Sequence, residues 1–148
     1  MRAVARLGPV LLALVCVVPA YAALEFRSIG GIPAILYDGP SVKANKIFVI
    51  GSGSPVEVVS TLEGWVKVRE SGGELGWAEA RALVPKRTVS ISVGQVTVRS
   101  EPSESATPVF RAQPGLILEL LEVTGIWARV RHQDGLTGYV RTNQVWGL

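Results

Sequence analysis

Residues 64–77 read Gly-Trp-Val-Lys-Val-Arg-Glu-Ser-Gly-Gly-Glu-Leu-Gly-Trp, and residues 126–139 read Ile-Trp-Ala-Arg-Val-Arg-His-Gln-Asp-Gly-Leu-Thr-Gly-Tyr. Each stretch begins with alternating apolar and basic residues, which is the period of a β-strand. A Gly-Gly or Asp-Gly pair follows, and such pairs accept the positive φ angles of tight hairpins. Each stretch therefore predicts two antiparallel strands. In the leading strand we expect the Trp and the later Val to share one face and the basic side chains to take the other.

The two stretches are part of a longer internal repeat. An offset of 62 residues aligns residues 34–83 with residues 96–145 without a gap, and 11 of the 50 pairs are identical. No segment after residue 22 shows a sustained helical period, and the apolar runs are short. We therefore predict an all-β protein, with about five short strands in each copy. Strands this short favour a small closed barrel, because closure removes exposed sheet edges.

The linker between the copies lies at residues 84–87, where Pro85 removes a backbone donor from any strand ladder. This gives three expected segments: residues 1–22, a first barrel at 23–86 and a second barrel at 87–148. A unit of about 60 residues is only marginally stable alone. We therefore expect the two barrels to pack against each other.

The first 22 residues have the pattern of a secretory signal peptide. Arg2 and Arg6 precede an apolar run at residues 10–18, and small residues lead to a cleavage site after Ala22. An uncleaved membrane anchor is the alternative. The sequence before Cys16 departs from a lipoprotein motif. Cleavage predicts a periplasmic protein with no cysteine and no membrane span.

The charge of the remaining chain is close to neutral. The whole chain has 15 basic and 12 acidic residues, but two of the basic ones precede residue 22. A balance of 13 to 12 gives no electrostatic footprint for nucleic acid or an anionic membrane. We therefore expect neither as a partner.

The repeated pattern resembles the bacterial SH3 domain. In that family Gly-Trp-x-Lys-Val is followed by a glycine-containing hairpin and by Gly-Trp or Gly-Tyr before a last strand. Residues 64–77 match this order, and residues 127–140 match it without the glycine before the Trp. The resemblance implies two tandem SH3-like barrels. It also implies a non-catalytic role, since family members generally bind cell-wall peptide or other extended ligands.

The inventory of reactive side chains is consistent with a non-enzyme. His132 is the only histidine, so a multi-histidine zinc site cannot form, and we expect no metal and no cofactor. No Gly-x-Ser-x-Gly elbow occurs, and Gly51-Ser52-Gly53-Ser54 is interpreted as a connector. Glu57 and Glu119 are the acids retained in both copies. We interpret each as an exposed strand residue or as the acid of an ion pair with Lys67 or Arg129.

Aromatic and basic residues mark the candidate ligand-binding faces. Large rings dominate surfaces that recognise extended peptides, although a small barrel also needs large side chains to fill its core. Arg99 stands where the first copy has Tyr37, so we expect the two barrels to present different sites. The loop residues Asp38, Asn45 and Lys46 would rim a groove in the first copy. The candidate residues are Tyr37, Asp38, Trp65, Trp77, Arg99, Trp127 and Tyr139.

These observations predict a secreted, non-catalytic module that binds peptidoglycan peptide or another extended peptide through aromatic and basic grooves. The alternative is an envelope adaptor that binds a periplasmic protein through the outer faces of its barrels. Both functions need only surface recognition, which the fold alone does not assign.

Overall fold

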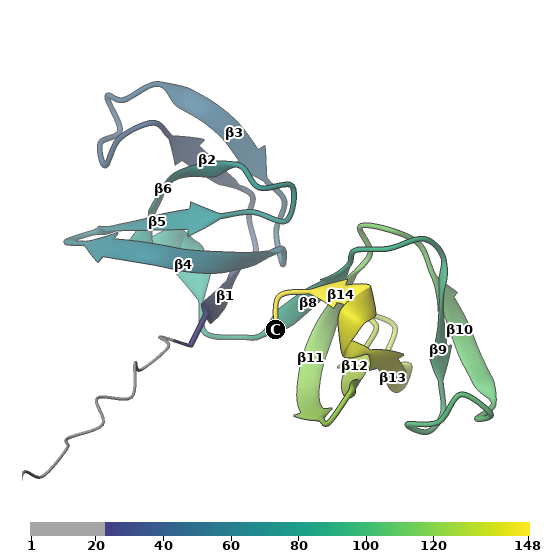
Figure 1. Ribbon diagram of the computed structural model, residues 1–148. Coiled ribbons are helices and arrows are strands. Elements are labelled where there is room, and N and C mark those ends of the chain that lie inside the picture. Colours follow the sequence, from purple (N-terminus) through teal and green to yellow (C-terminus); the bar gives the residue numbers. More distant parts are fainter. Residues whose placement is uncertain (1–22) are drawn as a thin grey trace, which may run out of the picture.

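The computed structural model describes residues 23–148 and contains two antiparallel sheets of seven strands each (Figure 1). This confirms the prediction of an all-β chain with two tandem barrels. The expected signal peptide and Cys16 lie outside the described residues. The first sheet contains β1 (Glu25–Ile29), β2 (Ala34–Tyr37), β3 (Lys46–Ile50), β4 (Pro55–Leu62), β5 (Trp65–Arg69), β6 (Leu75–Glu79) and β7 (Leu83–Val84). The second contains β8 (Thr88–Ile91), β9 (Val96–Arg99), β10 (Pro108–Ala112), β11 (Ile117–Thr124), β12 (Trp127–Arg131), β13 (Thr137–Arg141) and β14 (Val145–Trp146).

The two sheets have the same topology. Their strand orders are β3-β2-β6-β5-β4-β1-β7 and β10-β9-β13-β12-β11-β8-β14, so each strand of the second barrel repeats the strand seven places earlier. Each barrel has two strands more than expected. The additional strand β1 lies before the aligned repeat, and β7 has only two residues, which pair with β1 through Ile29 and Leu83.

The turns follow the glycines of the sequence. Gly73 and Gly135 both have φ of 96°, a conformation that glycine adopts without a steric penalty. These residues turn the β5–β6 and β12–β13 hairpins, as the Gly-Gly and Asp-Gly pairs predict. Single 3₁₀ turns, Ala80–Ala82 and Thr142–Gln144, lead into the last short strand of each barrel.

The core of each barrel is filled by aliphatic side chains and not by tryptophan. In β5, Val66 and Val68 are buried, whereas Trp65 lies on the other face with Lys67 and is half-buried. The expectation that Trp65 shares a face with Val68 is wrong, because residues three apart in a strand point to opposite sides. The same alternation places Trp127 outside the second core. The rings are therefore available on the outer faces.

The two barrels meet in a joint formed by β1, β8 and the end of β14. The rings of Phe26 and Trp146 meet edge to face with their centres 5.1 Å apart. The hydroxyls of Ser28 and Thr88 form a buried hydrogen bond of 2.7 Å across the joint. Arg87 lies over the Phe26 ring and donates a hydrogen bond of 2.8 Å to the carbonyl of Gly147. These contacts join the barrels through both an aromatic pair and buried polar groups.

Candidate binding site

The aromatic candidates of the first barrel come together on the outer face of three neighbouring strands. Tyr37 on β2 lies opposite Trp77 on β6, and Trp77 lies opposite Lys67 on β5. One step along the same face, Trp65 lies opposite Glu79. The sheet order β2-β6-β5 therefore assembles residues that are up to 42 positions apart in the sequence into two adjacent rows.

Contacts between these side chains order the face. Although β6 lies between their strands, the rings of Tyr37 and Trp65 meet at 90° with their centres 5.5 Å apart. The Lys67 ammonium lies 5.9 Å from the centre of the Trp77 ring, within the range of a cation–π interaction. Tyr37 is only 6% exposed. The Tyr37 ring is therefore covered and packs under the Trp65 ring, while Trp65 and Trp77 are partly exposed.

The equivalent face of the second barrel has a different chemistry. Arg99 lies opposite Tyr139, and Trp127 lies opposite Arg141. The Arg141 guanidinium covers the Trp127 ring at 5.2 Å, in place of the ring-to-ring contact of the first barrel. Arg99 stands in place of Tyr37 and Arg141 in place of Glu79, so the second face has one aromatic side chain fewer and a more basic charge than the first.

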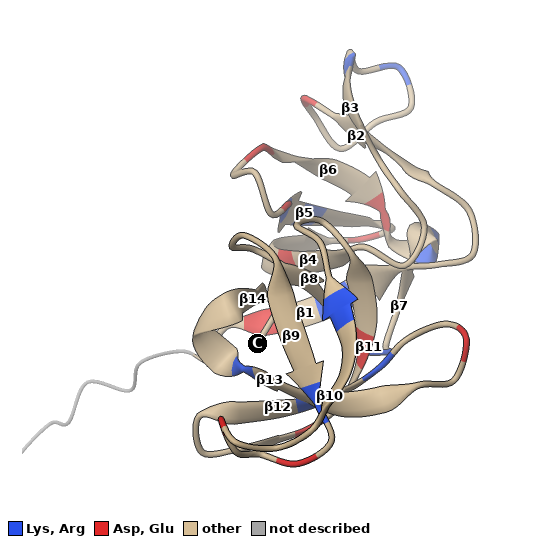
Figure 2. Cartoon of the chain, turned by 90° about the vertical axis from the view of Figure 1, so that its right-hand side faces the viewer, with Lys and Arg blue, Asp and Glu red and all other residues tan. Residues whose placement is uncertain are grey.

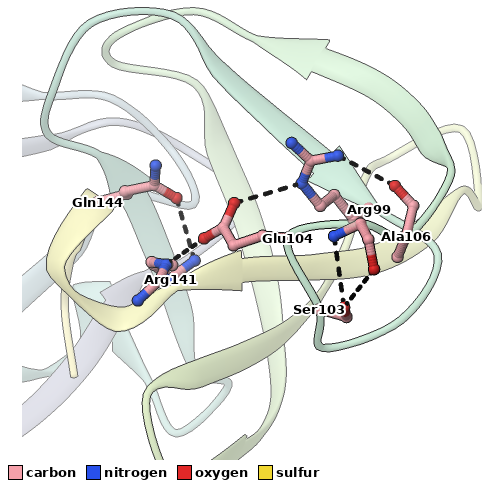
Figure 3. A network of polar contacts seen from close by, with 7 residues as sticks. Arg99, Ser103, Glu104, Ala106, Arg141 and Gln144 are labelled. Carbon is pink, nitrogen blue, oxygen red and sulfur yellow. Dashed lines mark hydrogen bonds and ion pairs between the residues drawn. The ribbon is translucent and has the colours of Figure 1, made fainter.

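A polar network holds these two arginines in place (Figure 3). The carboxylate of Glu104 lies between them, paired with Nε of Arg141 and 3.8 Å from Nε of Arg99. Arg99 also donates a hydrogen bond of 3.0 Å to the carbonyl of Ala106, and the Arg141 amide donates to Oε1 of Gln144 at 3.1 Å. Much of the donor capacity of the second face is therefore committed within the protein.

A concave pocket of about 470 Å³ opens beside Tyr37 in the first barrel. Its walls are the β1–β2 loop and β2 on one side and the 3₁₀ turn on the other, and most of the lining side chains are apolar. Glu79 and Arg81 provide the charged groups, with Nε of Arg81 donating to Oε2 of Glu79 at 2.8 Å. The hydrogen bond to Glu79 raises the pKa of the Arg81 guanidinium above its ordinary value.

Of the predicted site residues, only Tyr37 lines this pocket. Sequence reasoning missed Ile32, Glu79 and Arg81, which also line it. The repeat did contain a signal, because Glu79 aligns with Arg141 and the sign of the charge is reversed between the copies.

The expected rim residues Asp38 and Asn45 bond to each other. Oδ1 of Asp38 accepts from the Asn45 amide at 3.0 Å, and Oδ2 accepts from Asn45 Nδ2 at 2.8 Å. Lys46 begins the edge strand β3 and does not line the pocket. Asp38 and Asn45 therefore fix the β2–β3 loop.

The acidic and histidine candidates lie in local polar contacts. Glu57 pairs with Arg69 at 2.8 Å, directly across the β4–β5 ladder, and not with Lys67 as expected. His132 faces Asp134 at 2.9 Å in a hairpin turn. In residues 23–148, no group of three or more His, Cys, Asp or Glu side chains is arranged to hold a metal ion. Within the same range, no helix is long and apolar enough to cross a membrane.

Charged residues of both signs are distributed over the two barrels (Figure 2). Segments coloured for Lys and Arg and segments coloured for Asp and Glu both occur on loops and on strands. This pattern agrees with the near balance of 13 basic and 12 acidic residues after residue 22. Short-range geometry therefore matters more for recognition here than a long-range field.

Comparisons with known proteins give the family. Three similar solved structures are NlpC2 and NlpC1 from Trichomonas vaginalis and an NlpC/P60 family protein from Bacillus cereus. They are 17%, 18% and 18% identical to this chain, each with a TM-score of 0.40. The matches cover 87%, 95% and 82% of this chain but 50%, 52% and 56% of the others, so the chain spans about half their length. No curated protein matches the chain. The family model described as bacterial SH3 domain matches residues 31–85 and 92–147, and the chain belongs to that family as a tandem pair.

Proposed function

We propose that this protein is a non-catalytic module that binds extended peptide, with the peptides of peptidoglycan as its ligand. The observation that carries the proposal is the pocket beside Tyr37, which combines apolar walls with the Glu79–Arg81 ion pair at its rim. A carboxylate and a guanidinium side by side match a ligand that carries both ammonium and carboxylate groups next to small apolar side chains. Such ligands are typical of peptide and not of a single nucleotide or lipid.

The half-exposed rings extend the same surface. Trp65 and Trp77 lie on the face that Tyr37 supports, next to the pocket. Aromatic rings provide large contact areas at low entropic cost, which suits an extended chain that must be held along its length. Export with cleavage after Ala22 is part of this proposal, because it would place the protein in the periplasm, where peptidoglycan is found.

Sedimentation with purified peptidoglycan sacculi tests the proposal. The purified protein should sediment with sacculi in physiological salt, and Ile32→Asp should reduce the bound fraction about tenfold or more. Ile32 is 77% exposed and lines the pocket, so the substitution should leave the fold intact. Val123→Asp, at an exposed position of β11 away from the pocket, is the matched control and should bind like the wild type. No sedimentation of the wild-type protein, or equal loss in both variants, would overturn the proposal.

An envelope adaptor is the second candidate, and one observation favours it. The edge strand β3 exposes Ile47, Phe48 and Val49, and edge strands with apolar side chains are sites of strand pairing. The corresponding edge strand β10 instead has Pro108 and Arg111, which disfavour pairing with a strand of another protein. If this edge holds a protein partner, Val49→Lys should abolish a single stoichiometric cross-link in envelope preparations and leave sacculus binding unchanged. Unchanged cross-linking would remove this candidate.

A further inference from the structure

A second hollow, of about 220 Å³, lies between the two barrels and shares no residue with the pocket beside Tyr37. Ser52 and Gly53, from the β3–β4 connector, form its wall in the first barrel. Lys86 from the linker and Glu119, Arg131 and His132 from the second barrel form the other side. Both barrels are therefore needed to build this hollow.

Its charged groups are paired loosely. The carboxylate of Glu119 lies 3.4 Å from Nζ of Lys86 and 3.6 Å from Arg131, and both distances exceed those of charge-assisted hydrogen bonds. Among the described residues, neither cation donates a side-chain hydrogen bond. Lys86 and Arg131 therefore keep donors available next to the hollow.

The first barrel provides an internal comparison. There the equivalent pair is closed, because Nη1 of Arg69 donates a hydrogen bond of 2.8 Å to Oε2 of Glu57. Leu24 occupies the position equivalent to Lys86, so the second cation is missing. The nearby hollow of that barrel contains Glu25 and Glu57 and no basic residue. The excess of donors is thus a property of the second barrel and its linker.

The net charge of the groups that line the hollow favours a ligand with a single negative charge. Two cations and one carboxylate leave a net charge of about +1, which a single negative charge neutralises. A dianionic phosphate would add a second negative charge close to Glu119, and like charges at short range repel. A planar carboxylate also matches the forked donors of a guanidinium.

We propose that the inter-barrel hollow binds the carboxylate of a peptide, either a C-terminal carboxylate or an acidic side chain, between Lys86 and Arg131. The bound group lies against Ser52 and Gly53 of the first barrel, so the ligand contacts both copies at once. This site is independent of the peptide pocket beside Tyr37, because the two are built from different residues.

The test compares two ligands that differ by one charge. Acetyl-trialanine with a free C-terminal carboxylate is titrated into the purified protein, followed by its C-terminal amide, with amide NMR shifts of Gly53, Thr88 and Gln133 as the readout. The carboxylate form should give saturable shifts at these residues. The affinity fitted from the same shifts should be at least about tenfold lower for the amide form. Equal responses to the two ligands would overturn the proposal, as would tighter binding of inorganic phosphate than of the carboxylate.

Equivalent arginine variants in the two barrels distinguish binding at this site from a general effect of removing a positive charge. Arg131→Gln and Lys86→Met should each weaken carboxylate binding about tenfold or more. Both side chains are about half exposed or more, so neither substitution disturbs a core. Arg69→Gln changes the equivalent arginine of the first barrel and should bind like the wild type. Equal loss in Arg69→Gln, or wild-type affinity in Arg131→Gln, would overturn the assignment. Sacculus binding, which depends on Ile32, is expected to persist in Arg131→Gln, so the two proposals fail separately.

Discussion

The hydroxyl oxygens of Ser28 and Thr88 lie 2.7 Å apart, and both side chains are buried in the joint between the barrels. Thr88 also donates its hydroxyl proton to the carbonyl of Gly53 at 2.7 Å. A hydroxyl has only one proton to donate, so Ser28 must be the donor to Thr88. The result is a short relay that runs from the first barrel to the second and back.

These two hydrogen bonds predict that Thr88→Val lowers the free energy of unfolding. The substitution keeps the shape of the side chain but leaves the Ser28 hydroxyl and the Gly53 carbonyl without their shared partner. We expect the free energy of unfolding to fall by about 1–3 kcal/mol, measured by urea denaturation. Thr61→Val, at an exposed position of β4, is the control and should change it by less than about 0.5 kcal/mol. Wild-type stability in Thr88→Val would show that the relay adds no net stability.

The aromatic pair at the joint predicts a change in cooperativity. Trp146→Ala removes the edge-to-face packing against Phe26 and should cost about 2 kcal/mol or more. Without this aromatic pair, we expect calorimetry to show two separate melting transitions in place of one. Trp77→Ala removes a half-buried ring that lies away from the joint, and this control should melt in a single transition. One transition in both variants would mean that the polar contacts alone couple the barrels.

Close packing at Gly138 predicts a strong effect of one added methyl group. A Cβ at this residue would lie 2.6 Å from Cγ1 of Val98 and 2.7 Å from the carbonyl oxygen of Arg99, so β13 and β9 would have to separate. We expect Gly138→Ala to lower the free energy of unfolding by about 1–3 kcal/mol. Gly94→Ala is the control, since a Cβ there meets no atom within 4 Å. Equal stability of the two variants would contradict the tight approach of these strands.

The β12–β13 turn predicts a dependence of stability on pH. The amide of Leu136 donates to Oδ1 of Asp134 at 2.9 Å, and this bond, followed by the one to His132, lowers the pKa of Asp134. A lowered folded-state pKa means that the carboxylate stabilises the turn above the ordinary carboxyl pKa. This contribution is lost as the pH falls through the folded value. NMR titration of the Asp134 side-chain carbon should show a midpoint below about 3.9, the unperturbed value.

Asp134→Asn is the matched variant for this titration. Its amide oxygen still accepts from Leu136, but it has no charge to lose on acidification. The difference in unfolding free energy between the wild type and Asp134→Asn should therefore shrink between pH 6 and pH 3. A difference that grows on acidification would contradict the direction of the shift.

Much of the fold could be predicted because its signals are local. Alternation in residues 65–69 marked a strand, and Gly73 and Gly135 marked the hairpins, since each depends only on neighbouring backbone angles. Strand β1 was missed although Ser28 and Ile29 are repeated as Ser90 and Ile91. The four residues that follow have no identical counterparts, so the alignment stopped before it reached them.

The site was less accessible to sequence reasoning because it depends on contacts between distant strands. Aromatic type alone marked Tyr37, Trp65 and Trp77 as ligand-binding candidates, and the strand pairing places them on one face of the sheet. Nothing in the sequence showed that Tyr37 would be covered by Trp65, or that Glu79 and Arg81 would form the pocket rim. The partner of Glu57 was misassigned because ladder register sets it, and a bulge between Val58 and Ser60 shifts that register.

The joint also bears on how the protein withstands proteases. Lys86 and Arg87 form a dibasic pair that trypsin-like enzymes cleave readily in an open linker. Here the Arg87 side chain is held by the Gly147 carbonyl and the Phe26 ring, and β7 and β8 are paired on either side. A protease must draw several residues around the bond into its cleft, which requires these strands to leave their sheets. Cleavage at this point therefore reports on opening of the joint: the Lys86 side chain is exposed, but the backbone on either side of it is held in the two sheets.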